Sequence, residues 1–253
     1  LADGNTAKES GGAFYFSGVN EPMFIRDIAA VNFLNNTAGE YGGAVYIEAD
    51  GGDRTALRIS GNGSVLFSGN NAVSGGGALY VEGAISICGN TGDVVFQDNY
   101  LRRYDSIGSL KFIVLNSVAR GNGRTAYFAA NAGQSIIFAD ATTQLSNGSA
   151  YTHLNQYTPE GSTEAVTTQG TILFTGADAR TRLAKLWTEN GLTPQGDAFE
   201  AALEESVTST LNTTTLYGGT LAVEDGAVVN MWTFSAKKGA TLRLANDAKV
   251  VLT

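Results

Sequence analysis

Short runs of alternating hydrophobic and polar residues recur along the chain, and each is bounded by Gly, Asn, Asp or Ser. A period of two predicts β-strands that bury one face and expose the other. The expected strands are 14–16, 23–28, 45–48, 56–60, 65–67, 79–82, 84–88, 94–96, 111–115, 125–130, 135–138 and 171–174. Strands return near the end of the sequence, where 219–227 resembles 240–248 at an offset of 21 residues.

Two other stretches break this pattern. Residues 179–192 and 197–207 have apolar side chains at helical spacing, with Asp178 and Asp197 as expected N-caps. We expect a helical insertion over 178–207 that packs on the outside of the strands. Residues 141–170 are rich in Ser, Thr, Asn and Gly, which predicts a polar loop that leaves the body of the protein.

A repeated motif organises the first hundred residues. An Asn is followed six residues later by Gly-Gly in three segments, which are spaced by 31 and then 34 residues. An aromatic residue lies three positions before the Asn in the later copies. The residues that carry these motifs are Gly11, Gly12, Ala13, Phe33, Asn36, Gly42, Gly43, Ala44, Val45, Phe67, Asn70, Gly76, Gly77, Ala78, Leu79, Phe96 and Asn99.

About three strands per repeat, with no helix between them, is the pattern expected of a β-solenoid, in which each turn buries its inner face against its neighbours. We therefore predict an all-β protein, a right-handed parallel β-helix, over 1–253 as a single unit. Motif-bearing coils would cover 1–140, and further coils, expected to continue beyond the sequence, would cover 208–253. An antiparallel sandwich is the alternative, but it gives no reason for a fixed motif spacing.

Stacking of successive coils places equivalent residues about 4.8 Å apart. Asn36 over Asn70 would then form an amide ladder, and Phe33, Phe67 and Phe96 an aromatic stack. Gly and Asn suit the tight corners because both tolerate positive φ. Tyr15, Tyr46 and Tyr80 each lie two residues after the motif Ala. They would form a second aromatic column, and the apolar residues that alternate with them favour its exposure over its burial.

Composition narrows the functional classes. The chain of 253 residues has a net charge of −8, which disfavours nucleic-acid binding and adsorption to anionic membranes. One Cys (Cys88) and one His (His153) exclude a disulfide framework and a Cys/His metal site. His153 falls in the expected loop, which disfavours a Ser-His-Asp site, and Cys88 is expected to be a small core or corner residue. No metal and no cofactor are predicted.

The motifs resemble those of the chlamydial polymorphic membrane proteins, an autotransporter family with repeated GGA(I/L/V) and FxxN tetrapeptides. The GGA-type copies here begin at Gly42 and Gly76, with a divergent copy at Gly11, and the FxxN copies begin at Phe33, Phe67 and Phe96. The resemblance implies a passenger region exposed on the bacterial surface or outer membrane, or released as a secreted passenger. It also implies membrane attachment only through a separate C-terminal β-barrel.

The first functional hypothesis is therefore a non-enzymatic adhesin that binds a host-cell surface protein or glycan, with self-association left open. A second is a β-helical polysaccharide lyase or hydrolase, which would need clustered carboxylates on one face. Its candidate residues are Asp27, Asp53, Asp93, Asp98 and Asp105, with Arg102 and Arg103 nearby. A third is a purely structural stalk. The motifs themselves are explained by coil building without any ligand.

Overall fold

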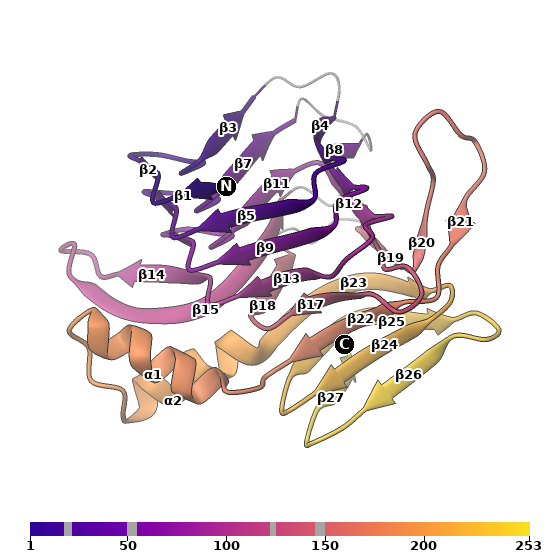
Figure 1. The fold of residues 1–253 in the computed structure, drawn as a ribbon. Helices are drawn as coiled ribbons and strands as arrows, with labels where there is room; N and C mark the ends of the chain where they lie inside the picture. The colour runs from indigo at the N-terminus through magenta and orange to yellow at the C-terminus, as the bar shows by residue number, and fades with distance from the viewer. Residues whose placement is uncertain (18–21, 50–54, 122–124, 145–149) are drawn as a thin grey trace.

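The strands of successive turns lie side by side in three long sheets, as predicted for a parallel β-helix (Figure 1). The structure is a computed structural model that describes residues 1–17, 22–49, 55–121, 125–144 and 150–253. The first sheet is parallel throughout. Its strands, in spatial order, are β1 (Ala2–Asp3), β5 (Ala30–Leu34), β9 (Ser64–Ser68), β13 (Val94–Gln97), β17 (Ser135–Phe138), β22 (Thr171–Thr175), β24 (Thr220–Glu224) and β26 (Thr241–Leu244).

The second sheet bends back on itself. One row of strands is β2 (Thr6–Ala7), β6 (Thr37–Ala38), β10 (Asn71–Ala72) and β14 (Tyr100–Tyr104). The other row is β3 (Phe14–Phe16), β7 (Val45–Glu48), β11 (Leu79–Glu82), β15 (Leu110–Gly121) and β18 (Ala141–Gln144). The two rows are joined where β14 pairs with β15 in antiparallel fashion.

The third sheet runs the length of the stack and is again parallel. Its strands are β4 (Met23–Arg26), β8 (Thr55–Ser60), β12 (Ala84–Cys88), β16 (Ala126–Ala129), β19 (Tyr151–Leu154), β23 (Thr208–Leu216), β25 (Val228–Ala236) and β27 (Lys249–Leu252). Alternate residues of all three sheets point inward and form one continuous hydrophobic core. Because each coil buries its inner face on the next coil, the core is a column along the stack.

The predicted loop over 141–170 is wrong in extent. Strands β18 and β19 lie inside it and are part of the stack, with Thr142 and Thr152 buried. Threonine is β-branched and pairs well in strands, so a polar composition did not prevent strand formation. The segment that leaves the sheets is a hairpin of β20 (Gln156–Tyr157) and β21 (Val166–Thr167), which projects at the upper right of Figure 1.

The helical insertion lies on the outside of the solenoid, as expected. Helix α1 (Ala179–Glu189) is shorter than its predicted stretch, and α2 (Asp197–Val207) has the predicted bounds. Asp178 is the N-cap residue of α1 but makes no side-chain capping bond, whereas Gly196, not Asp197, is the N-cap of α2. Neither helix in the described ranges is long and apolar enough to cross a membrane.

The helices pack mainly on β15. Leu183, Trp187 and Phe199 belong to a separate core cluster that also contains buried residues of β6, β10, β14 and β15. The indole of Trp187 donates a hydrogen bond to the Ile113 carbonyl (2.9 Å), and the Leu115 amide donates to Ser206 Oγ (2.8 Å). The insertion therefore satisfies backbone groups of β15 where a strand of a further coil would otherwise pair.

Candidate functional site

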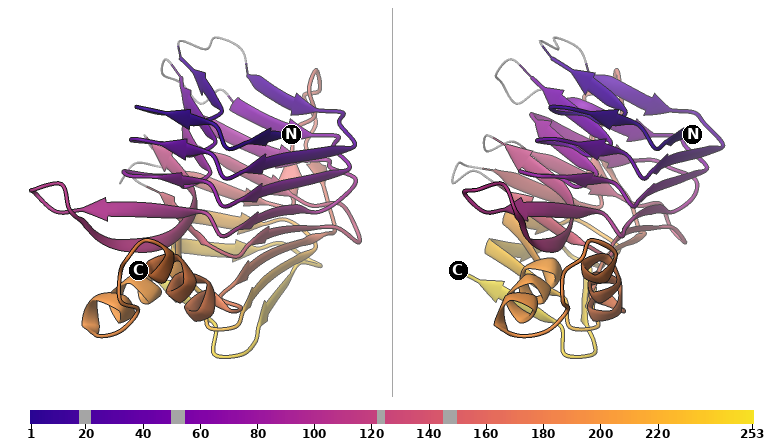
Figure 2. Two further views of the ribbon diagram at one scale, coloured as in Figure 1. Left: turned by 60° about the vertical axis from the view of Figure 1, so that its left-hand side comes forward. Right: turned by 90° about the vertical axis from the view of Figure 1, so that its left-hand side faces the viewer.

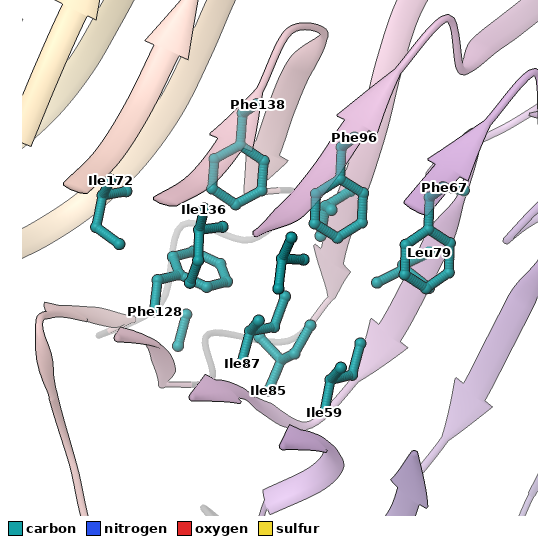
Figure 3. Close-up of a cluster of buried hydrophobic side chains, with 14 of the residues drawn as sticks. Ile59, Phe67, Leu79, Ile85, Ile87, Phe96, Phe128, Ile136, Phe138 and Ile172 are labelled. Atoms are coloured by element: carbon teal, nitrogen blue, oxygen red, sulfur yellow. The ribbon is translucent and has the colours of Figure 1, made fainter. Parts of the chain in front are cut away.

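The motif phenylalanines lie inside the solenoid and form the predicted stack. Ring centroids are 4.7 Å apart from Phe33 to Phe67 and 4.9 Å from Phe67 to Phe96, with nearly parallel planes. The stack continues through Phe138 and Phe174 at 5.2 and 5.0 Å. Figure 3 shows the rings of Phe138, Phe96 and Phe67 side by side in a row across the core. The parallel register fixes this arrangement because it pairs the same position of each coil.

The motif asparagines form the predicted amide ladder, which is longer than the sequence indicated. The side-chain amide of Asn5 donates to Asn36 Oδ1 (2.8 Å), Asn36 to Asn70 Oδ1 (2.8 Å), and Asn70 to Asn99 Oδ1 (2.9 Å). Each Oδ1 also accepts the backbone N–H of the Asn one coil before it. Asn36, Asn70 and Asn99 are fully buried, so the ladder satisfies the polar corner within the protein.

A buried carboxylate terminates this ladder. Asp140 Oδ2 accepts from the Asn99 side-chain amide (3.2 Å), the Asn99 backbone N–H (2.9 Å) and Ser117 Oγ (2.8 Å), while Arg182 of α1 donates to Oδ1 (2.7 Å). Burial raises the pKa of Asp140, and the charge of Arg182 opposes that shift. The ion pair joins the helical insertion to the end of the ladder.

The Gly-Gly-Ala motif builds the next corner of each coil. Gly11, Gly42 and Gly76 have φ of 69°, 60° and 60°, the left-handed region that a Cβ disfavours. The second glycine lies against the neighbouring coil, where a Cβ on Gly43 would overlap the Gly77 carbonyl and the Asn71 amide. Gly12 packs against the next coil in the same way as Gly43. The residues that follow the glycines lie in the core: Ala13 is at its edge, and the fully buried ones are Ala44, Val45, Ala78 and Leu79. The motif therefore permits close coil stacking.

The three tyrosines stack on the outside of the second sheet, but the expected exposed column is wrong for two of them. Ring centroids are 5.2 Å apart from Tyr15 to Tyr46 and 5.4 Å from Tyr46 to Tyr80. Tyr15 is 53% exposed, whereas Tyr46 and Tyr80 are 9% and 7% exposed. Tyr41 covers Tyr80 with ring centroids 4.5 Å apart. Burial raises the pKa of Tyr46, and it raises the pKa of Tyr80 to about 12.

The carboxylates proposed for a glycan-active enzyme stabilise local structure instead of gathering. Asp93 accepts from the Ser135 backbone N–H (2.7 Å), Asp98 pairs with Arg182 (3.3 Å), and Asp105 caps its own turn. Asp27 is exposed at a corner, and Asp53 lies outside the described residues. Within the described residues, no group of three or more His, Cys, Asp or Glu side chains could hold a metal ion.

The single cysteine is buried as expected, whereas the single histidine is not in the expected loop. Cys88 is buried as expected, with Ser86 Oγ 3.3 Å from its sulfur, and burial raises the pKa of its thiol. His153 is not in a solvated loop but in β19, stacked between Tyr127 (5.0 Å) and Tyr217 (5.4 Å). Burial lowers the pKa of His153, which favours its neutral form.

A second amide ladder was not predicted. The Asn62 side chain donates to Asn90 Oδ1 (3.0 Å) and accepts from the Ile28 backbone N–H (3.2 Å), at the corner between the third and first sheets. Asn155 has a similar place further along, where it accepts from the Ala130 N–H. Asn62 and Asn90 both follow a Gly, at an offset of 28 residues. That recurrence is the signal that could have identified them.

Comparison with known proteins gives a consistent set of similarities. The repeat of the Chlamydia polymorphic membrane proteins matches residues 30–48 and 64–82, which contain both motifs. The "Probable outer membrane protein pmp13" of Chlamydia pneumoniae is 33% identical over 232 residues, 87% of this chain. Those named pmp8 and pmp7 in the same organism are 27% and 25% identical over 98% and 96% of it. The chain spans about a fifth to a quarter of the length of these relatives. No solved structure matches significantly.

Proposed function

The chain belongs to the Chlamydia polymorphic membrane protein family, and on that premise we propose that it is a surface-displayed passenger that acts as an adhesin. Its relatives carry the name of outer membrane proteins, which supports a place at the bacterial surface or outer membrane. The partner would be a host-cell surface protein or glycan. The proposal assigns no enzymatic activity, no cofactor and no nucleic-acid partner.

The observation that carries the proposal is the inward direction of both repeated motifs. The motif residues build the fold: Phe67 and Ala78 lie in the core, Asn70 bonds to Asn99 at the corner, and Gly77 contacts the next coil. The repeats therefore supply a rigid scaffold. A rigid solenoid presents long outer faces whose residues can vary without loss of the fold. Binding would then depend on the outer faces and projections, in keeping with the rule that loops on a rigid scaffold carry function.

The scattered carboxylates disfavour the enzyme hypothesis. Acid–base cleavage of a glycan needs two carboxyl groups that face one another across the scissile bond. Asp93, Asp98 and Asp105 are instead engaged with Ser135, Arg182 and their own turn. Incubation with a panel of acidic polysaccharides, followed by assay of reducing and unsaturated ends, is expected to show no product. Product formation would contradict the proposal.

The direct test is binding to host cells. Beads coated with the purified chain are expected to bind cultured human epithelial cells in greater number than beads coated with an unrelated β-helical protein of similar charge. The matched protein controls for shape and for nonspecific electrostatic adhesion. Equal binding by the two would remove support for an adhesin and favour a structural stalk.

A further inference from the structure

One hairpin departs from the solenoid where the first row of the second sheet ends. Residues 100–113, called the arm, contain β14 and the first residues of β15 and extend to the far left of Figure 1, beyond the stacked coils. The left-hand view of Figure 2 shows the same projection above the two helices. Within the described part of the three long sheets, this is the one antiparallel pairing. Tyr100 and Leu101 pair with the preceding coil, but the sequence beyond them does not follow the repeat motifs, so coil building does not explain the projecting part of the arm.

The tip of the arm is held in one conformation. Asp105 Oδ1 accepts from the backbone N–H groups of Ile107 (3.0 Å) and Ser109 (2.9 Å). The backbone adds two further bonds, from the Asp105 N–H to the Ser109 carbonyl (3.0 Å) and from the Gly108 N–H to the Asp105 carbonyl (3.1 Å). A tip that is ordered before binding loses less conformational entropy in a complex.

The base of the arm is anchored as well. Trp187 and Ser206 of the helical insertion bond to the backbone of β15, as described above. On β14, Arg103 pairs with Glu205 of α2 (3.5 Å) and donates to the carbonyls of Val73 and Ser74 (3.2 and 3.3 Å). The arm is therefore supported by both the helices and the preceding coil.

This ordered tip displays hydrophobic side chains to solvent. Ile107 is 84% exposed and Tyr104 is 43% exposed. Fourteen large hydrophobic residues are exposed in the described parts of the chain, and ten of them lie in residues 1–28 or 232–252. The other four are Tyr104, Ile107, Tyr151 and Val166, and two of these lie on the arm. A single exposed hydrophobic residue is ordinary on a protein surface. Two on a projecting and internally braced turn form a shape that can enter a pocket of a partner.

The arm also differs from the rest of the chain in charge. It contains Arg102, Arg103 and Lys111 but only one acidic residue, Asp105, in a protein of net charge −8. Because Glu205 already pairs with Arg103, the positive charge that the arm can present to a partner is that of half-buried Arg102 and exposed Lys111. The partner surface that complements it is therefore acidic, with an apolar pocket. Such complementarity raises the rate of encounter and fixes orientation, while the buried apolar contact supplies most of the affinity.

We propose that the arm is the contact element of this passenger, with Ile107 inserted into an apolar pocket of a host-surface protein whose rim is acidic. This inference rests on the proposed adhesin function and assigns the binding to one element. Tyr104 adds apolar contact beside Ile107, and Lys111 faces the acidic rim.

The test compares single substitutions in the bead assay. Ile107→Ser is expected to reduce binding to host cells roughly tenfold or more, as for the central residue of an interface, and Tyr104→Ser and Lys111→Glu are expected to reduce it less. Val166→Ser, which removes a 41% exposed hydrophobic residue from the other hairpin, is the matched control and is expected to bind as the original chain does. Thermal unfolding of each variant should be unchanged, because these side chains are exposed.

The outcomes separate the two proposals. If the original chain binds and Ile107→Ser binds equally well, the arm is not the contact element, while the adhesin function stands. If the original chain does not bind, the adhesin function fails and the arm proposal fails with it. Binding that survives protease treatment of the host cells would indicate a glycan or lipid partner and overturn the arm proposal. So would an Ile107-dependent dimer in light scattering, since the occupant would be a second copy.

Discussion

The corner that follows each strand of the first sheet is built differently in the motif coils and in the C-terminal coils, which contain β24 and β26. In the motif coils, a residue two positions after the stacked Phe has positive φ (Asn35 53°, Gly69 69°, Asp98 58°), and the next residue is a buried ladder Asn. In the C-terminal coils, Asp225 and Asn246 keep the positive φ (55° and 54°), but they are followed by Gly226 and Asp247. The left-handed residue is therefore common to both regions, and the buried Asn is not.

The difference follows from where the chain goes next. After β9 the chain continues into β10 of the second sheet before it reaches the third sheet, whereas after β24 it passes directly to β25 of the third sheet. The two extra strands, β10 and β11, open the corner and leave backbone groups such as the Phe33 carbonyl inside it, and Asn70 bonds to that carbonyl (2.9 Å). The ladder Asn is thus a requirement of the wider coil, and the narrower coil dispenses with it.

The largest expected effect concerns the column of core residues that is aromatic in the motif coils and aliphatic in the C-terminal coils. Phe33, Phe67, Phe96, Phe138 and Phe174 are followed in register by Val223 and Leu244. Phe67→Ala removes a fully buried ring stacked on both sides, and we expect a loss of about 4 kcal/mol in the free energy of unfolding. Leu244→Ala, at a position that is 49% exposed, is expected to cost less than about 1 kcal/mol. Urea titration of both variants measures the contrast, and similar losses would contradict it.

The next effect concerns the amide ladder. Asn70→Ala removes the oxygen that accepts from both the Asn36 side-chain amide and the Asn36 backbone N–H, and it removes one donor to the Phe33 carbonyl. Buried polar groups left without partners destabilise the fold, and we expect a loss of about 3 kcal/mol. Asn32→Ala is the matched control, because Asn32 is half-buried in β5 and lies outside the ladder, and its cost should stay within about 0.5 kcal/mol. Equal costs at the two positions would show that the ladder adds no stability.

The parts of the fold that the sequence predicted are those that repeat. Phe67 and Asn70 recur at nearly constant offsets, and parallel stacking turns a constant offset into a contact. Asp140 was not recognised as the end of the ladder because it lies two residues after Phe138, whereas Asn36, Asn70 and Asn99 each lie three residues after a Phe. The sequence also could not predict which strand the helices pack on, because Trp187 and Ser206 bond to residues of β15 that are more than seventy positions away in the sequence.

The tyrosine column marks a second limit of sequence reasoning. Alternation along β7 and β11 correctly directed Tyr46 and Tyr80 away from the core. It could not show that Tyr41 packs on both rings, or that Ala119 of the following coil lies beside Tyr80. Exposure of an outward residue depends on its neighbours across coils, and these belong to distant sequence. The arm was likewise not predicted, since residues 111–115 indicated a strand but not the hairpin that precedes it.

The tyrosine column is confined to the motif coils, so we expect the stability of the motif coils, but not that of the C-terminal coils, to depend on its ionisation. Burial, with a smaller effect of Glu82, raises the pKa of Tyr80 from 10.0 to about 12, so the folded chain retains a proton that the unfolded chain loses. The stabilising contribution is complete below pH 10 and is lost as the pH rises towards 12. We expect Tyr80→Phe to weaken the fall in urea midpoint between pH 9 and about 11.5. An unchanged fall would mean that Tyr80 titrates as it does in the unfolded chain.

The smallest expected effect is at the exposed corner of the C-terminal coils. Asn246 donates to Asp225 Oδ1 (2.7 Å) but has a φ of 54°, so Asn246→Gly loses a solvated hydrogen bond and relieves an unfavourable backbone conformation. The two effects oppose each other, and we expect a change within about 0.5 kcal/mol. The same substitution in the ladder, Asn99→Gly, is expected to cost several times more, because Asn99 is fully buried and bonds to Asp140. If urea unfolding finds equal losses, the C-terminal corner depends on its polar residue as much as the motif corner does, and the distinction between the two coil types is wrong.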